Sequence, residues 1–256
     1  MEAGRSAASR LVWSPVFIGL WMLCLVSTTA LGELGVAGQG VAASAMSQIE
    51  LDGSLPGSID EVGGPGGSLY IVQPDLENLV GADEALNGGN LFYSLRHFIL
   101  ASGDSALFPA TVPSSSVPIT LSPDNAIVRV TGGLTSEIFG PVDFAFDHAN
   151  IFFLNPYGVI VGEGGNFDVP ASFFLSTADR LSFQDGHFET HLPAGEPVLG
   201  MEGLDCCGGA PTAFGFDFGT SNQVVFDGQN LNWEDGAIVQ VVAGDVDLVE
   251  GVKLKV

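Results

Sequence analysis

The sequence predicts an all-β chain, because three of its features agree. Apolar and polar residues alternate with period two over several short runs, as in residues 142–147 and 180–184. Strands with one buried and one solvated face produce this alternation. Turn-forming pairs such as Asp185-Gly186 separate the runs, and the chain contains 35 glycines. Many short strands with frequent turns indicate a sandwich, a barrel or a β-solenoid, and the pattern alone favours solenoid and sandwich about equally.

Residues 1–32 have the composition of a secretory signal peptide. Arg5 and Arg10 precede an apolar run over residues 16–26, and small residues precede a cleavage point before Glu33. The run is shorter than the roughly 20 residues that span a bilayer, which disfavours a membrane anchor. We therefore expect export across the inner membrane, to the cell surface or the medium.

The chain is strongly acidic, with 7 Lys and Arg against 30 Asp and Glu and a formal net charge of −23. Such a surface repels phosphates, which disfavours nucleic acid and anionic lipid as partners. Disorder is disfavoured too, because 46% of the residues are hydrophobic and only 14% are charged. After the signal we expect a flexible leader over residues 33–47 and one domain over residues 48–256, long enough for a substantial core.

The first predicted element of the domain is a strand over residues 48–51, which the turn Asp52-Gly53 ends. A glycine-rich loop is predicted at residues 63–67. Residues 75–87 carry one weak helical signal, which Gly81 interrupts.

Later segments alternate and predict strands that bury one face. Residues 187–192 place Phe188 among polar neighbours. The last predicted strands are short, with short turns between them, as the rungs of a solenoid are: residues 224–227, 231–233, 237–243 and 246–249.

Three cysteines are present, and only Cys206 and Cys207 follow the signal. Their Cα atoms are about 3.8 Å apart, because the residues are adjacent. A disulfide scaffold is therefore excluded. Two buried or loop thiols, free or oxidised to each other, are favoured over a metal pair, because no C-x-x-C spacing is present.

Several phrases, in order, resemble the filamentous haemagglutinin N-terminal domain family, the two-partner secretion domain of exoproteins. They are residues 48–55 (QIELDGSL), 89–95 (GNLFYSL), 129–133 (RVTGG), 149–160 (ANIFFLNPYGVI), 167–169 (FDV) and 176–179 (STAD). The chain departs from the family pattern at Tyr93, where His is usual, and at Leu95, where Phe is usual.

The resemblance implies a right-handed parallel β-helix, a single-stranded solenoid, with capping strands at its N-terminal end. It also implies a partner: an outer-membrane two-partner-secretion transporter whose periplasmic domains recognise the chain, which then folds outside the cell. Family members continue into long adhesin, cytolysin or matrix regions. Binding to a host or matrix glycan or protein is therefore expected of sequence beyond these 256 residues.

Two phrases supply candidate recognition residues for the transporter: Asn90, Leu91 and Phe92, and Asn155, Pro156 and Gly158. Turn chemistry also explains the second set. Pro156 fixes φ, Gly158 permits a positive φ, and Asn155 can hydrogen-bond the turn backbone. Both interpretations, a β-helix corner and a transporter contact, remain open. For Asn90 the alternatives are a side chain buried in a capping turn and a transporter contact.

Rival functions are a β-helix carbohydrate-active enzyme and a stand-alone glycan-binding surface protein. Glycosidases need paired carboxylates, but pairs arise by chance among 30 acidic residues. His187-x-Glu189-x-His191 could ligate zinc, but the residues between them are apolar or small, which puts this face toward water. The sequence predicts no catalytic residue, metal or cofactor.

Overall fold

The computed structural model of the chain describes residues 42–44, 46–74, 86–87, 89–114, 117–190, 207–217, 222–227, 230–232, 237–249 and 253–255. The predicted signal peptide and almost all of the predicted leader lie outside these residues. The described residues belong to one compact unit of the chain, residues 38–256.

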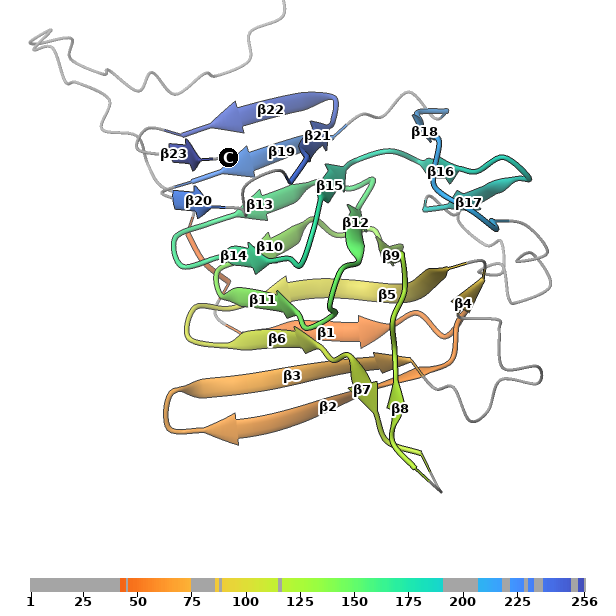
Figure 1. The fold of residues 1–256 in the computed structure, drawn as a ribbon. Coiled ribbons are helices and arrows are strands. Elements are labelled where there is room, and N and C mark those ends of the chain that lie inside the picture. The colour runs from red at the N-terminus through yellow and green to blue at the C-terminus, as the bar shows by residue number, and fades with distance from the viewer. Residues whose placement is uncertain are drawn as a thin grey trace, which may run out of the picture. The chain divides into compact units, whose positions relative to one another are not determined.

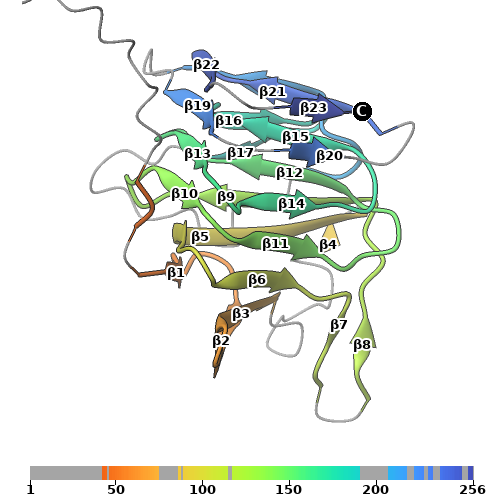
Figure 2. The ribbon, with the colours of Figure 1, turned by 90° about the vertical axis from the view of Figure 1, so that its left-hand side faces the viewer.

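Three stacks of parallel strands form the body of this unit, as Figures 1 and 2 show. The first stack contains β5 (Asn90–Leu100), β9 (Asn125–Val130), β12 (Asn150–Leu154), β15 (Phe173–Ser176) and β21 (Val239–Val242). The second contains the far half of β5, β10 (Ser136–Ile138), β13 (Val159–Val161), β19 (Gln223–Phe226) and β22 (Asp245–Leu248). The third contains β3 (Gly67–Pro74), β6 (Ser105–Phe108), β11 (Pro141–Phe144) and β14 (Asn166–Asp168).

The parallel pairing distinguishes between the two folds that the pattern favours. The chain visits the three stacks in turn and then returns to the first, so each circuit adds one coil to a parallel β-helix. Val224 pairs with Val246 and Pro141 pairs with Asn166, so a coil takes 22 to 25 residues where nothing is inserted. β20 (Asn230–Asn232) and β23 (Lys253–Lys255) pair in parallel in the same manner. The β-helix prediction is confirmed and the sandwich is not observed.

Antiparallel strands cover the N-terminal coil. β1 (Gln48–Leu51) pairs with β5, β2 (Gly57–Gly64) pairs with β3, and the short β4 (Leu86–Asn87) also pairs with β5. The prediction of a loop at residues 63–67 is wrong: Gly64 pairs with Gly67 across a two-residue Pro65-Gly66 turn, and the glycines continue the two strands. Of the predicted helical segment, residues 75–85 lie outside the described residues, and Leu86 and Asn87 form a strand.

Two insertions project from the coils. β7 (Thr111–Val112) and β8 (Ile119–Thr120) form a hairpin between the first and second coils. β16 (Arg180–Ser182), β17 (His187–Glu189) and β18 (Ala213–Gly215) form a small antiparallel sheet, inserted between β15 and β19. The turn between β16 and β17 has Gln184 and Asp185 at its centre, and the Phe183 N–H donates to the Gly186 backbone oxygen at 2.8 Å to close it.

Aromatic side chains fill the interior of the β-helix. Phe108 and Phe144, on the paired strands β6 and β11, stack with their ring centroids 4.4 Å apart. Tyr93 lies among them, only 3% exposed, with its ring edge-on to Phe108 at 5.0 Å. Its hydroxyl has no hydrogen-bond partner among the described residues. A buried polar group without a partner costs about 1–3 kcal/mol, so this hydroxyl opposes folding.

Replacing Tyr93 by Phe should therefore leave the free energy of unfolding unchanged or raise it by about 1 kcal/mol, because the ring stays and the unpaired hydroxyl goes. Urea denaturation measures this value. The matched control is Tyr70→Phe at a half-buried tyrosine, where no gain is expected. A clear loss of stability in Tyr93→Phe would contradict the assignment of an unpaired hydroxyl.

Candidate functional site

The six candidate recognition residues are buried in the folded domain. Asn90, Leu91 and Asn155 are 0% exposed and Phe92 is 1% exposed. Pro156 and Gly158 are buried as well. Asn90 to Phe92 open β5, and Asn155 to Gly158 connect β12 with β13, so the structure places the two sets on different parts of the coils.

Asn90 begins a ladder of asparagines that crosses three coils. Asn90, Asn125 and Asn150 are in register on β5, β9 and β12. The Nδ2 of Asn125 donates to Oδ1 of Asn90 at 2.7 Å, and the Nδ2 of Asn150 donates to Oδ1 of Asn125 at 3.1 Å. The central amide, Asn125, therefore donates to one neighbour and accepts from the other.

The free end of the ladder holds a distant loop. The Nδ2 of Asn90 donates to the backbone oxygens of Cys207 at 2.7 Å and Gly209 at 2.6 Å, 117 and 119 residues later in the chain. Cys207 is fully buried and disulfide-bonded, and Cys206 lies outside the described residues. The interpretation of Asn90 as a buried structural residue therefore accounts for all of its observed contacts.

The turn after β12 is built around Asn155. Its Nδ2 donates to the backbone oxygen of Leu134 at 2.9 Å and to Oγ of Ser136 at 2.8 Å, both on the preceding coil. Its Oδ1 accepts the backbone N–H of Tyr157 at 2.9 Å. Gly158 has φ +105°, which residues with a side chain rarely adopt. The turn chemistry predicted from the sequence is confirmed, and Asn155 also ties the turn to the neighbouring coil.

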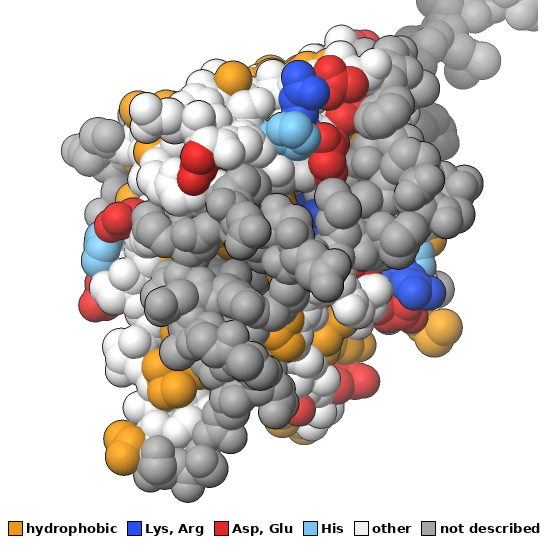
Figure 3. Space-filling view, turned by 90° about the vertical axis from the view of Figure 1, so that its right-hand side faces the viewer, with side chains coloured by type: hydrophobic (Ala, Val, Ile, Leu, Met, Phe, Trp, Pro, Cys, Tyr) orange, Lys and Arg blue, Asp and Glu red, His pale blue; other side chains and the backbone are white. Residues whose placement is uncertain are grey.

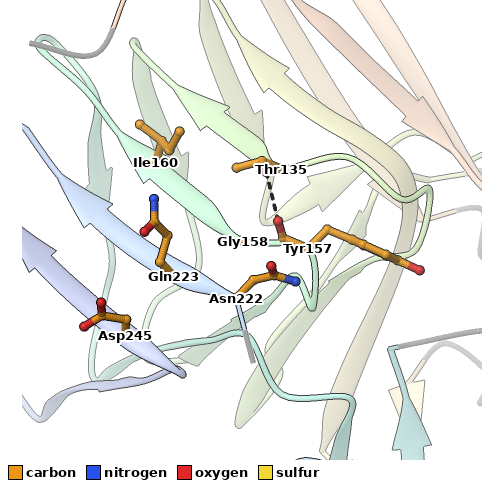
Figure 4. Close-up of a pocket in the computed structure, with 7 residues that line it drawn as sticks. All are labelled: Thr135, Tyr157, Gly158, Ile160, Asn222, Gln223 and Asp245. Atoms are coloured by element: carbon orange, nitrogen blue, oxygen red, sulfur yellow. Dashed lines mark hydrogen bonds between the residues drawn. The ribbon is translucent and has the colours of Figure 1, made fainter. Parts of the chain in front are cut away.

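A hollow of about 350 Å³ lies beside this turn (Figure 4). Residues from four successive coils line it: Thr135, Tyr157, Gly158, Ile160, Asn222, Gln223 and Asp245. The Asn222 amide donates to the backbone oxygen of Pro156 at 2.6 Å, and the Thr135 hydroxyl donates to that of Tyr157 at 2.9 Å. The turn residues are thus buried, but the depression beside them is open to solvent.

A second polar centre surrounds Arg129, whose role the sequence reasoning missed. Arg129 is 1% exposed. Its guanidinium donates to Ser94 Oγ at 2.5 Å, to Ser54 Oγ at 2.9 Å and to the backbone oxygen of Glu189 at 2.6 Å. Its Cζ also lies 4.2 Å from the centre of the Phe188 ring. One side chain therefore joins the N-terminal cap, two coils of the helix and the inserted sheet.

Asp52 completes this network. Its carboxylate accepts hydrogen bonds from the hydroxyls of Ser54 at 2.7 Å, Ser94 at 2.5 Å and Thr131 at 3.0 Å. Burial acts to raise the pKa of Asp52, but the bonds from Ser94 and Ser54 and the Arg129 charge outweigh it, so that pKa lies below its usual value. Burial lowers the pKa of Arg129 to about 10, so the guanidinium remains charged at neutral pH.

Apolar residues lie in register beside these polar groups. Phe92, Ile127 and Phe152 face away from the helix interior on β5, β9 and β12. The inserted sheet covers them with Leu181, Phe183 and Phe188; the Phe92 and Phe188 ring centroids are 4.8 Å apart. We call these six residues the outer cluster. The outside of the first coils is therefore a second core.

Ionisable groups elsewhere form small pairs. On the inserted sheet, Arg180 pairs with Asp217 at 2.5 Å and His187 with Glu189 at 3.0 Å, while His191 lies outside the described residues. Figure 3 shows basic, acidic and histidine side chains gathered on the face turned toward its viewer. Among the described residues no group of three or more His, Cys, Asp or Glu could hold a metal ion.

One carboxylate pair is in register on the outside of the third stack. Asp143 on β11 pairs with Asp168 on β14. Burial, and then the charge of Asp168, raises the pKa of Asp143. Among the described residues no Lys, Arg or His forms an ion pair with either carboxylate. The basic group that a polysaccharide lyase needs beside its carboxylates is thus not found at this pair.

Residues 71–253 match the family model described as TPS secretion domain. No curated protein matches the chain. In the part of the chain that the structure describes, no helix has the length and apolarity to cross a membrane.

Replacing Arg129 by Met should lower the free energy of unfolding by at least about 3 kcal/mol, because three hydrogen bonds to a charged buried group are lost. Arg180→Met is the matched control: its ion pair is about one-third exposed, so the expected loss is at most about 1 kcal/mol. Equal losses in the two variants, measured by urea denaturation, would show that Arg129 does not join the segments.

The lowered pKa of Asp52 predicts a pH-dependent contribution to stability. A carboxyl whose pKa is lower in the folded state stabilises the fold above its unfolded value, near 3.8, and loses that contribution as pH falls through the folded pKa. The difference in unfolding free energy between the natural chain and Asp52→Asn should therefore be constant from about pH 5 to 7 and shrink below pH 4. A difference that grows toward low pH would reverse the assigned sign.

Proposed function

The chain belongs to the TPS secretion domain family, the two-partner secretion domains of exoproteins, and we propose that its transporter recognises it before it folds. The observation that carries this proposal is the burial of all six candidate residues. A partner cannot touch Asn90, Phe92 or Asn155 in the folded domain without opening it. In an unfolded chain the same residues are accessible.

We propose that the periplasmic domains of an outer-membrane transporter bind the phrases at residues 89–95 and 149–160 in extended form. Both phrases contain strand-forming residues, Phe and Tyr in the first and Ile, Phe, Tyr and Val in the second. Extended segments of this kind can add to an exposed strand edge or fill apolar pockets. The predicted signal peptide over residues 1–32 would deliver the chain to the periplasm.

The positions of the contacts that close the fold support the proposal that the chain folds after export. The Asn90 amide donates to the backbone oxygens of Cys207 and Gly209, and the Arg129 guanidinium donates to the backbone oxygen of Glu189. Phe92 needs Phe188 to cover it. The first coils thus keep unpaired polar groups and exposed apolar surface until about 120 more residues have followed Asn90. The N-terminal part of the chain stays incompletely folded, and so able to thread, while those residues cross.

Once the fold is complete, movement of the exported chain back through the transporter is disfavoured. Burial of apolar surface stabilises by roughly 25 cal/mol per Å², and the inward residues of the coils and the outer cluster become buried together. An adhesive or other activity of a longer exoprotein would reside in sequence outside this domain.

The test compares binding of the unfolded and the folded chain to the purified periplasmic domains of the co-encoded transporter. Chain freshly diluted from urea should bind at least about 10-fold more tightly than refolded chain, because the phrases are then exposed. Asn155→Ala should weaken binding of the unfolded chain. Asn166→Ala, at an exposed asparagine outside both phrases, should not. Equally tight binding by the refolded chain would refute recognition before folding.

A further inference from the structure

The hollow beside the Asn155 turn is lined by equivalent positions of four coils, one of which is a glycine. Thr135, Gly158, Gln223 and Asp245 occupy matching outward positions on four successive coils, as the registers of β10, β13, β19 and β22 require. A Cβ on Gly158 would lie 3.1 Å from the backbone oxygen of Gln223 and 3.5 Å from the side chain of Thr135. Even a Cβ at this position would crowd the Gln223 backbone, so Gly158 permits the close approach of the next coil beside the hollow.

The glycine is required by the turn. Gly158 has φ +105°, and an L side chain there would be strained whatever the space available. The conformation that lets Asn155 lock two coils together thus requires a glycine among the residues that line the hollow. We call this hollow the Gly158 pocket.

Its lining divides into groups that the turn already uses and groups that face solvent. The Thr135 hydroxyl and the Asn222 amide donate to turn carbonyls. Gln223 and Asp245 are exposed and adjacent in register, and the half-buried Ile160 lies two residues beyond Gly158 on β13, on the side away from the turn. Figure 4 shows these three side chains on neighbouring strands beside Gly158, with the ring of Tyr157 directed away from them.

The electrostatics of the pocket favour a cation. Asp245 contributes a carboxylate, and one of its oxygens accepts the backbone N–H of Val246 at 2.9 Å. The other carboxylate oxygen of Asp245 and the side-chain amide oxygen of Gln223 are further acceptors. No Lys or Arg is among the lining residues, and the chain carries a formal net charge of −23. An anionic ligand would be repelled, whereas a cation gains from both the local carboxylate and the field of the whole chain.

We propose that the Gly158 pocket binds a primary ammonium group on an alkyl stem, the chemistry of a lysine side chain or a free polyamine. The ammonium would donate to Asp245 and to the Gln223 carbonyl oxygen, and the stem would lie against Ile160. Long basic side chains commonly bury their methylenes on apolar surface in this way. The site belongs to the folded domain, so it is independent of the recognition proposed above.

The test is an NMR titration of the full folded chain with three probes. Nα-acetyl-lysine methylamide supplies the side chain, spermidine supplies the free polyamine, and Nα-acetyl-norleucine methylamide supplies a similar stem without charge. We expect saturable shifts of the Gly158, Gln223 and Asp245 amide signals with the lysine probe, with a Kd of about 1–10 mM, since an exposed ion pair is weak. Saturation by spermidine alone would assign the site to free polyamines.

Two variants separate a pocket from general attraction to an acidic surface. Asp245→Asn should weaken binding about 5-fold, the upper end for an exposed ion pair. Asp247→Asn removes the same charge from the same strand, at an exposed position outside the pocket, and should change binding less than about 2-fold. Equal effects of the two variants, equal shifts with norleucine, or no saturable shift would each overturn the proposal.

Discussion

The buried guanidinium of Arg129 is the constraint on which the arrangement of the domain depends. It has five N–H donors and no acceptor, so it must be surrounded by oxygens if it is to remain charged inside a protein. Those oxygens come from Ser54, Ser94 and Glu189, which lie in the cap, the first coil and the inserted sheet. If any of these segments is missing, a buried charge lacks a partner. The Asn90 ladder imposes the same condition on the loop at Cys207.

This condition changes how the fold should be understood as a solenoid. In a simple solenoid each coil contacts only its neighbours, so stability and folding can proceed one coil at a time. Here the inserted sheet, reached only after the third coil, covers the outside of the first three strands of the first stack. The domain should therefore complete its fold as one unit from Asp52 to about Gly209. For a secreted chain, this arrangement would let most of the domain cross the membrane unfolded and then fold in a single late step.

The sequence predicts much of this structure, and its most consequential failure concerns the outer face of the first coils. Period-two alternation correctly puts Val142 and Phe144 inside, and the resemblance correctly indicates parallel coils. The same alternation puts Arg129, between the inward residues Val128 and Val130, on an outer face that should meet water. It is buried because a sheet formed some 60 residues later covers that face, and local periodicity carries no information about such a covering. Asn90 and Phe92 are buried for the same reason.

Of the candidate site, turn chemistry predicts the conformation of Gly158, but only the register of four coils shows which residues line the hollow beside it. Residues 135 and 158 are 23 apart and residues 223 and 245 are 22 apart, but the insertion between β15 and β19 places residues 158 and 223 at a separation of 65. The sequence shows no fixed spacing that would relate them. Register between coils is thus the information that the sequence pattern lacks.

Native-state hydrogen exchange tests most directly whether the domain closes as one unit. Amides of β5, β9 and β17 should open with the same free energy across a series of low urea concentrations, because Arg129 and the outer cluster bind these strands together. Exchange from β16–β18 at a much lower free energy, with β5 and β9 still protected, would contradict this account. It would show that the coils are stable without the inserted sheet.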